Sequence, residues 1–192
     1  MTDASVIAYE TYAHEFIACR SPTIGAKSIE RWAHSLAPGS TVLELACGSG
    51  CPVTETLLAA GLHVSAIDSS PTLIAEVESR FPDLRVRCER VQDGSWFDRT
   101  FDAVVSIGLL FLLEEEDQLS MIKRVATTLK PGGRFLFTAP VEIGTWDDAL
   151  TGHPCRSLGL ERYCAALDAS KISLLRRFSD SGGNNHYDSR LG

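Results

Sequence analysis

The segment 42–50 constrains the fold of this chain more than any other. It reads VLELACGSG, with apolar residues around one acid, followed by Gly48 and Gly50. Pro52 comes next and predicts the start of a helix, because proline is favoured in the first helical turn. A buried strand that ends in Gly-x-Gly and turns into a helix is typical of a nucleotide-binding turn. The two glycines lack a Cβ, so the backbone can pass close to a ligand.

The residues after the glycines exclude two common nucleotide sites. A dinucleotide fingerprint needs a third glycine or an alanine at position 53, where Val53 stands. A phosphate-binding P-loop needs Gly-Lys followed by Ser or Thr, and the sequence has no such segment. What remains is an acid, Glu44, four residues before Gly48 and six before Gly50.

This arrangement resembles motif I of the class I S-adenosylmethionine-dependent methyltransferases, usually Asp/Glu-x-Gly-x-Gly-x-Gly. Here Ala46 replaces the first glycine. The segment Lys130-Pro131-Gly132-Gly133 resembles a further family hallmark, which turns a helix into the fifth strand. The resemblance implies S-adenosylmethionine as methyl donor, S-adenosylhomocysteine as product and a Rossmann-like fold.

Length and composition predict a globular protein in the cytoplasm. The 192 residues suffice for one domain, and the net charge of -7 argues against binding nucleic acid. The sequence contains no apolar run long enough to predict a membrane span, and its N-terminus lacks the basic segment that is typical of a secretory signal. The six cysteines are scattered without metal-ligand spacing, so we expect free thiols and no metal.

Hydrophobic patterning predicts alternating strands and helices, and hence an α/β fold. Strands are expected at 41–46, 62–67, 84–88, 101–107, 134–138, 171–178 and 186–191, and helices at 52–60, 71–81, 114–130 and 160–169. With the resemblance, this order implies a mostly parallel seven-stranded sheet, an antiparallel last strand and helices on both faces. We expect a single domain over 1–192, comprising an N-terminal helical cap (1–38), a cofactor-binding core (40–140) and a C-terminal helix and strand pair (141–192).

Candidate cofactor residues follow the strands, because ligands of such sheets bind at the carboxyl ends. Asp68 ends the second strand and is expected to accept both ribose hydroxyls, although it could instead cap the next helix. In the resembled family an acid after the third strand binds the adenine amino group, but Arg90 and Val91 stand at that pair. The expected cofactor residues are Glu44, Ala46, Gly48, Gly50, Asp68, Ser69, Glu89, Val91, Asp93, Ser106 and Gly108. Among these, Glu89 and Asp93 are alternative acids for binding the adenine amino group, and the resemblance implies that Ser106 and Gly108 face the methyl group and the acceptor.

The acceptor is expected to be a small molecule, bound by a monomer or homodimer. The segment after the fifth strand is short, and no Asn-Pro-Pro-Tyr type motif follows the fourth. The candidate general bases are His14, His153 and His186, since imidazole titrates near neutrality. The expected acceptor pocket contains the aromatic residues Tyr9, Tyr12, Phe111, Trp146 and Tyr187.

Two other functions remain open from the sequence. The departures at Ala46 and Arg90 permit a non-catalytic S-adenosylmethionine-binding regulatory protein. A nicotinamide-linked oxidoreductase on a related fold is disfavoured by the missing third glycine.

Overall fold

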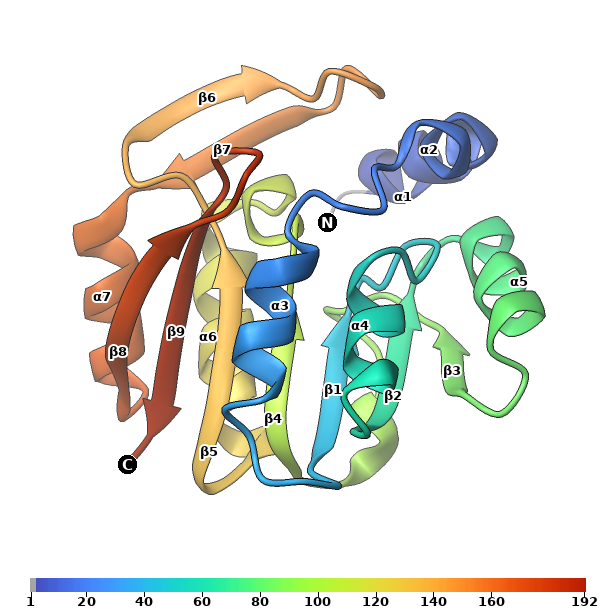
Figure 1. Cartoon of the computed structure of the whole chain (residues 1–192). Coiled ribbons are helices and arrows are strands. Elements are labelled where there is room, and N and C mark those ends of the chain that lie inside the picture. The colour runs from blue at the N-terminus through green and yellow to red at the C-terminus, as the bar shows by residue number, and fades with distance from the viewer. Residues whose placement is uncertain (1–2) are drawn as a thin grey trace.

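A seven-stranded sheet in the order β3-β2-β1-β4-β5-β9-β8 runs through the molecule (Figure 1). The computed structural model describes residues 3–192, with side chains from Ser5 onward, so the first two residues of the expected cap lie outside the described part. The strands are β1 (Thr41–Leu45), β2 (His63–Asp68), β3 (Arg85–Cys88), β4 (Phe101–Ser106), β5 (Leu129–Thr138), β8 (Ile172–Ser179) and β9 (Asn185–Leu191). Strands β1 to β5 are parallel, and β9 is antiparallel to both of its neighbours. The predicted sheet, including its antiparallel last strand, is confirmed.

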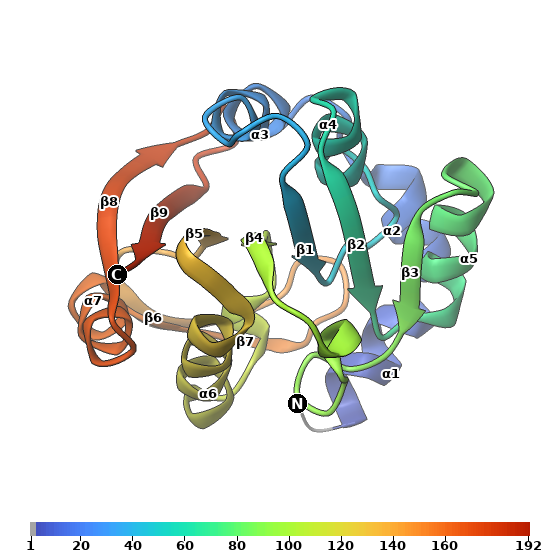
Figure 2. The ribbon, with the colours of Figure 1, turned by 90° about the horizontal axis from the view of Figure 1, so that it is seen from below.

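Helices cover both faces of the sheet, as Figure 2 shows from below. One face carries α3 (Ala26–Ala33), α4 (Val53–Ala59) and α5 (Pro71–Arg80), and the other carries α6 (Glu115–Thr128) and α7 (Leu160–Ala169). The two faces follow from strand alternation. In β1, Val42 packs with α3 and α4, whereas Leu43 packs with α6.

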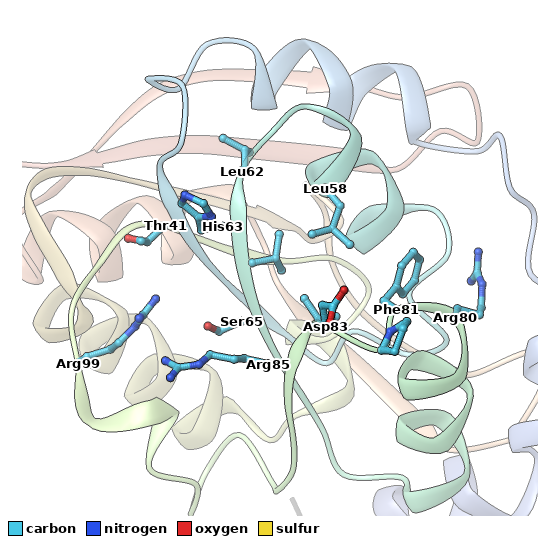
Figure 3. A pocket seen from close by; sticks show the side chains of 13 residues that line it. Thr41, Leu58, Leu62, His63, Ser65, Arg80, Phe81, Asp83, Arg85 and Arg99 are labelled. Atoms are coloured by element: carbon cyan, nitrogen blue, oxygen red, sulfur yellow. The ribbon is translucent and has the colours of Figure 1, made fainter.

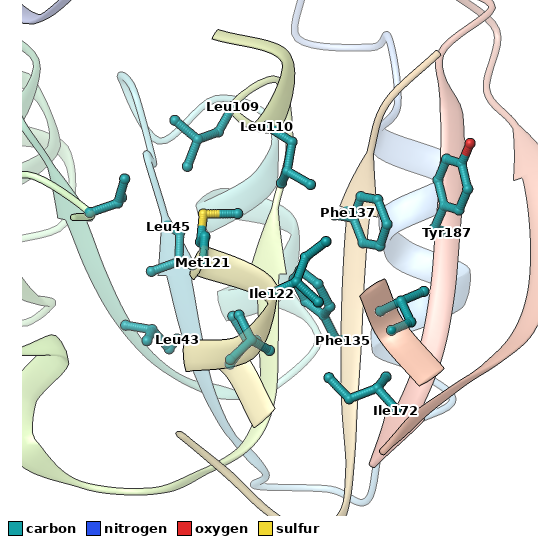
Figure 4. Packing of buried hydrophobic residues seen from close by; sticks show 14 of the residues in the cluster. Leu43, Leu45, Leu109, Leu110, Met121, Ile122, Phe135, Phe137, Ile172 and Tyr187 are labelled. Atoms are coloured by element: carbon teal, nitrogen blue, oxygen red, sulfur yellow. The ribbon is translucent and has the colours of Figure 1, made fainter. Parts of the chain in front are cut away.

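The largest core cluster lies on the α6 and α7 face (Figure 4). Tyr187 is fully buried in it and stacks on Phe137 with ring centroids 4.7 Å apart. Its hydroxyl donates to the Pro140 carbonyl at 3.5 Å, and burial raises the pKa of Tyr187 to about 12. The expectation that Tyr187 lines an acceptor pocket is therefore wrong, because alternation along β9 turns this side chain into the core.

The segment Lys130-Pro131-Gly132-Gly133 lies within β5 and joins the starts of three strands. The Lys130 ammonium donates to Asp102 Oδ1 at 2.8 Å, and Asp102 Oδ2 accepts from the Thr41 backbone N–H at 2.9 Å. A Cβ on Gly133 would lie 2.8 Å from the Lys130 carbonyl oxygen, so the turn has no room for a side chain there. This motif has a structural role and lies at the end of the sheet opposite the carboxyl ends of the parallel strands.

Two parts of the chain lie outside the seven-stranded sheet and the helices packed on it. The N-terminal region, expected as a helical cap, forms the helices α1 (Asp3–Thr11) and α2 (Ala13–Cys19) before α3. The segment after β5, where no strand was expected, forms a separate antiparallel hairpin of β6 (Ile143–Asp147) and β7 (Pro154–Leu158). Figure 1 shows α1, α2 and this hairpin at the same end of the sheet, beyond the carboxyl ends of the parallel strands.

Candidate functional site

The turn after β1 contains three residues with left-handed backbone conformation. Gly48 and Gly50 have φ angles of 58° and 76°, and Ala46 has a φ of 57°. An L-residue in this left-handed region costs roughly 1–2 kcal/mol, which gives a physical reason for glycine at the position that Ala46 occupies. Ala is the smallest side chain that can stand there.

Glu44 is a buried carboxyl beside this turn. It is 3% exposed, and its Oε2 accepts a hydrogen bond from the Thr54 hydroxyl at 2.7 Å. Burial raises the pKa of Glu44 to about 8, against the opposing effect of the Thr54 bond. The carboxyl therefore holds its proton up to the neutral range.

Glu44→Gln is expected to make folding stability less dependent on pH. The folded pKa lies above the unfolded one, so the stabilising contribution of Glu44 is complete below pH 4.5 and is lost as the pH rises through 8. The amide can keep the hydrogen bond to Thr54 without carrying a charge. At pH 8.5 the free energy of unfolding of the variant should therefore exceed that of the wild type by on the order of 2–4 kcal/mol, and near pH 4.5 the two should be equal. Urea unfolding of both proteins at the two pH values measures this. The exposed Glu55→Gln is the control, and a Glu44→Gln difference that is equal at both pH values would contradict the burial argument.

Asp68 joins the turn after β1 to the end of β2. Its Oδ2 accepts from the Gly48 N–H at 2.8 Å, and its Oδ1 accepts from the Ser70 N–H at 2.9 Å. Burial raises the pKa of Asp68, although these backbone bonds oppose the shift. The N-cap of α5 is Ser70, whose Oγ accepts from the Leu73 N–H at 3.1 Å, so Asp68 does not cap the helix. Each Asp68 oxygen keeps a lone pair for a ligand.

A cavity of about 440 Å³ opens at the carboxyl ends of the strands. Nine of the predicted site residues line it: Tyr9, Glu44, Ala46, Gly48, Asp68, Ser69, Gly108, Phe111 and His186. They come from α1, the β1 and β2 turns, the end of β4 and the start of β9. The structure therefore brings together residues that are separated by most of the chain.

The N-terminal helices close over this cavity. The Tyr9 hydroxyl donates to Asp148 Oδ2 in the β6–β7 turn at 3.3 Å. Glu10 accepts from the Thr72 hydroxyl at 2.6 Å and from the Ser70 hydroxyl, both at the start of α5. A Cβ built on Gly48 would lie 3.0 Å from the Phe16 ring of α2, so the glycine turn and the helices are closely apposed.

The predicted adenine acids point elsewhere. Glu89 accepts from the backbone N–H groups of Ser95 at 3.3 Å and Trp96 at 3.1 Å, which fixes the loop before β4. Asp93 pairs with Arg90 at 3.1 Å, and Val91 is buried in the core. None of these residues lines the cavity.

Other predicted residues also lie outside the cavity lining. A Cβ on Gly50 would meet the Phe81 ring at 2.9 Å, so this glycine is needed for packing against α5 rather than for ligand access. Ser106 is fully buried in β4. Tyr12 is exposed, and Trp146 packs on the cavity residue Phe111 with ring centroids 5.5 Å apart.

The three candidate histidines have different surroundings. His14 is exposed on α2, and His153 lies with its Nε2 3.3 Å from the Leu112 carbonyl oxygen. His186 is buried, lines the cavity and has its Nε2 3.2 Å from Asp180 Oδ2. Only His186 of the three combines burial with a place in the cavity wall.

Arg20 is a cavity residue that the sequence did not reveal. It follows α2, and its Nε donates to the Cys51 carbonyl at 3.1 Å across 31 positions of the chain. Its guanidinium is the one Lys or Arg group in the cavity wall within the described residues. The only sequence indication was a lone arginine between two helical segments.

A larger hollow of about 730 Å³ lies at the opposite end of the strands (Figure 3). It is lined by the first residues of β1, β2 and β3, which are Thr41, His63 and Arg85. Ligands of parallel sheets bind at the carboxyl ends, so the smaller cavity is the candidate site.

The fold and this strand-end site define a class of protein, and comparisons with known proteins agree. Residues 42–133 match a family described as "Methyltransferase domain". The chain is 32% identical over 141 residues to cypemycin N-terminal methyltransferase of Streptomyces sp, covering 69% of this chain and 56% of that relative. It is 35% identical over 101 residues to ubiquinone biosynthesis O-methyltransferase of Xanthomonas campestris, covering 50% and 41%. The chain thus spans about half the length of the curated relatives it matches.

Solved structures share the fold at low sequence identity. The glycopeptide N-methyltransferase MtfA in complex with S-adenosylmethionine has a TM-score of 0.71 and 19% identity over 88% of this chain and 95% of that chain. A methyltransferase from Clostridium acetobutylicum has a TM-score of 0.73 and 18% identity over 96% and 99%. The family match places a methyltransferase domain at residues 42–133, and the chain shares the fold of these solved methyltransferases.

Proposed function

We propose that this chain transfers a methyl group from S-adenosylmethionine to a small-molecule acceptor and releases S-adenosylhomocysteine. The observation that carries the proposal is the Asp68 carboxylate, which is bonded to the Gly48 N–H inside a cavity that both residues line. An acid at the end of the second strand, beside a glycine turn, suits the two hydroxyls of a ribose. The cavity volume of about 440 Å³ also lies in the range of small-ligand sites.

The cavity residues fit this cofactor in three places. Asp68 would accept the ribose hydroxyls, and the turn at Ala46 and Gly48 would let the ligand lie against the backbone. Arg20 would pair with the carboxylate of the methionine part, because guanidinium and carboxylate match in charge and geometry. When bound, the cofactor supplies an activated methyl group on its sulfonium.

The adenine part is expected to bind without an acid. Glu89 and Asp93 already have partners in their own loop, whereas the apolar Leu73 and Leu109 line the cavity. We infer that these two side chains pack against the ring. The role of the protein is then mainly to align donor and acceptor, an effect that can supply on the order of 7–11 kcal/mol.

Transfer of the labelled methyl group to a panel of small acceptors tests the proposed activity. Appearance of labelled product that depends on chain and acceptor supports it. Binding of S-adenosylhomocysteine without transfer to any acceptor would favour the non-catalytic alternative. Absence of both binding and transfer would exclude the methyltransferase proposal and the non-catalytic alternative.

Arg20→Gln is expected to weaken the binding of S-adenosylhomocysteine about 10- to 100-fold. A hydrogen bond to a charged partner contributes about 1.5–3 kcal/mol, which corresponds to that loss of affinity. Isothermal titration calorimetry measures it, with the exposed Arg31→Gln on α3 as control. An unchanged dissociation constant would remove Arg20 from the cofactor site.

The cellular location and the oligomeric state are proposed from general properties of the chain. All six cysteines are free thiols, which is compatible with a reducing cytoplasm. No helix between residues 3 and 192 has the length and apolar character to cross a membrane. We propose a cytoplasmic monomer or homodimer with one methyltransferase domain, whose net charge of -7 disfavours a nucleic-acid acceptor.

A further inference from the structure

The turn between β8 and β9 is built around one buried carboxylate, Asp180. Its Oδ1 accepts from the backbone N–H groups of Gly182 at 2.8 Å and Asn184 at 3.0 Å, and its Oδ2 lies 3.2 Å from His186 Nε2. The Asp180 side chain is 3% exposed. Burial alone would raise the pKa of Asp180, but hydrogen bonds from Asn184, His186 and the backbone outweigh it and hold the pKa below its usual range. Asp180 is therefore anionic near neutral pH.

The hydrogen bond to Asp180 fixes the state of His186. A carboxylate can only accept, so Nε2 carries the proton and Nδ1 has the free lone pair. Nδ1 is buried and has no hydrogen-bond partner within the part of the chain that the structure describes. Burial also lowers the pKa of His186, so the ring is neutral near pH 7. The ring stacks on Phe178 with centroids 4.9 Å apart, so its plane is held.

This Asp180–His186 pair lies on the cavity wall beyond the end of β4. His186 is paired with Thr138, the last residue of β5, and the Thr138 hydroxyl accepts from the Gly108 N–H at 2.8 Å. Gly108, Thr138 and His186 all line the same cavity as Gly48 and Asp68. The pair is thus on the side away from the proposed ribose site.

A second carboxylate, Asp148 in the β6–β7 turn, also lines the cavity. Its Oδ1 accepts from the Thr151 N–H at 2.8 Å, and its Oδ2 accepts from the Tyr9 hydroxyl. Among the described residues, neither Asp148 nor Asp180 forms an ion pair with Lys or Arg. Carboxylates in a cavity wall that lack a Lys or Arg partner favour a positively charged ligand.

We propose that the methyl acceptor is an amine, which the cavity carboxylates Asp148 and Asp180 attract as an ammonium ion and which loses its proton to His186 Nδ1. This inference depends on the proposed methyl transfer. The nitrogen lone pair freed by the proton transfer forms the new N–C bond. The C–S bond of the sulfonium breaks and its electron pair stays on sulfur, so the positive charge ends on the methylated amine, while the proton on His186 passes to solvent.

Acceptor class is tested by methyl transfer to matched sets of amines, phenols and thiols. We expect transfer to amines, and we expect amines to bind the chain loaded with S-adenosylhomocysteine in calorimetry. Asp180→Asn should weaken amine binding at least tenfold. His186→Gln should lower turnover by about 100-fold or more, the usual size of a general-base effect, with unchanged S-adenosylhomocysteine affinity. Asp83→Asn and His63→Gln, both in the opposite hollow, are the matched controls.

Imidazole ¹⁵N chemical shifts provide a readout independent of activity. In the wild type, the His186 proton should be on Nε2. In Asp180→Asn the amide can donate to Nε2, which should move the proton to Nδ1 and remove the base. If Asp180→Asn no longer binds S-adenosylhomocysteine, Asp148→Asn replaces it in the amine-binding test.

The failures of the two proposals are distinguishable. Transfer to phenols or thiols but not amines would overturn the amine inference and leave the methyltransferase proposal intact. Unchanged turnover in His186→Gln, or an unchanged tautomer in Asp180→Asn, would overturn the role of the pair. If no acceptor in the panel is methylated, calorimetry with amines and the chain loaded with S-adenosylhomocysteine tests the amine inference. Absence of amine binding in that measurement counts against the inference. If the wild type does not bind S-adenosylhomocysteine at all, the proposed function itself is overturned.

Discussion

Asp68→Ala is expected to weaken the binding of S-adenosylhomocysteine at least 100-fold. The carboxylate would make two charge-assisted hydrogen bonds to the ribose, worth about 1.5–3 kcal/mol each. Its removal also leaves the Gly48 N–H without its acceptor, because Asp68 Oδ2 lies 2.8 Å from the Gly48 nitrogen and holds the turn. Calorimetric titration of both proteins gives the ratio of dissociation constants directly.

Two companion variants sharpen this result. Asp68→Asn retains the size and one acceptor oxygen, so its loss of affinity should be smaller than that of Asp68→Ala. Asp83→Ala changes an exposed acid in the opposite hollow and should bind like the wild type. Wild-type affinity in both Asp68 variants would exclude the proposed cofactor site.

Asp188→Ala is expected to lower the free energy of unfolding by about 3–5 kcal/mol, the usual cost of removing one partner of a buried ion pair. Asp188 is fully buried in β9, and its two oxygens accept from Arg134 at 2.5 Å each. It also accepts from Trp32 Nε1 at 3.1 Å and Arg176 Nε at 2.9 Å, joining α3, β5 and β8. The variant would leave Arg134, whose side chain is 15% exposed, without its counter-charge.

Urea unfolding at pH 7 measures this change. Arg176→Gln, which removes a half-exposed partner of the same carboxylate, should cost less than about 1 kcal/mol. If Asp188→Ala costs no more than Arg176→Gln, the buried network does not stabilise the fold as the geometry indicates.

The sheet could be predicted because its central strands are buried on both faces. Strands such as β1 and β4 are short, largely apolar segments bounded by turn residues, a pattern that depends on local sequence. The β6–β7 hairpin has no such pattern, since most residues of β6 are exposed. Its turn is fixed by Asp148, which accepts from the backbone at Leu150 and Thr151, and no apolar periodicity reports a bond of that kind.

The candidate site divides along the same lines. Glu44, Gly48 and Asp68 line the cavity, and their place there could be predicted because it follows from their position at the strand ends. Arg20 could not, because it reaches the cavity across 31 positions of the chain. His186 and Tyr187 were predicted together, but neighbouring residues of a strand face opposite sides, so one lines the cavity and the other the core. The sequence shows this alternation but not which side holds the ligand.

The dihedral angles at Ala46 have a consequence for how this family is recognised. The residue letter departs from the family pattern, whereas the backbone adopts the left-handed conformation that glycine adopts most readily. What the turn requires is a conformation, and glycine is only its least strained solution. A motif written as a series of φ and ψ angles would therefore include members that a motif written in residue letters excludes.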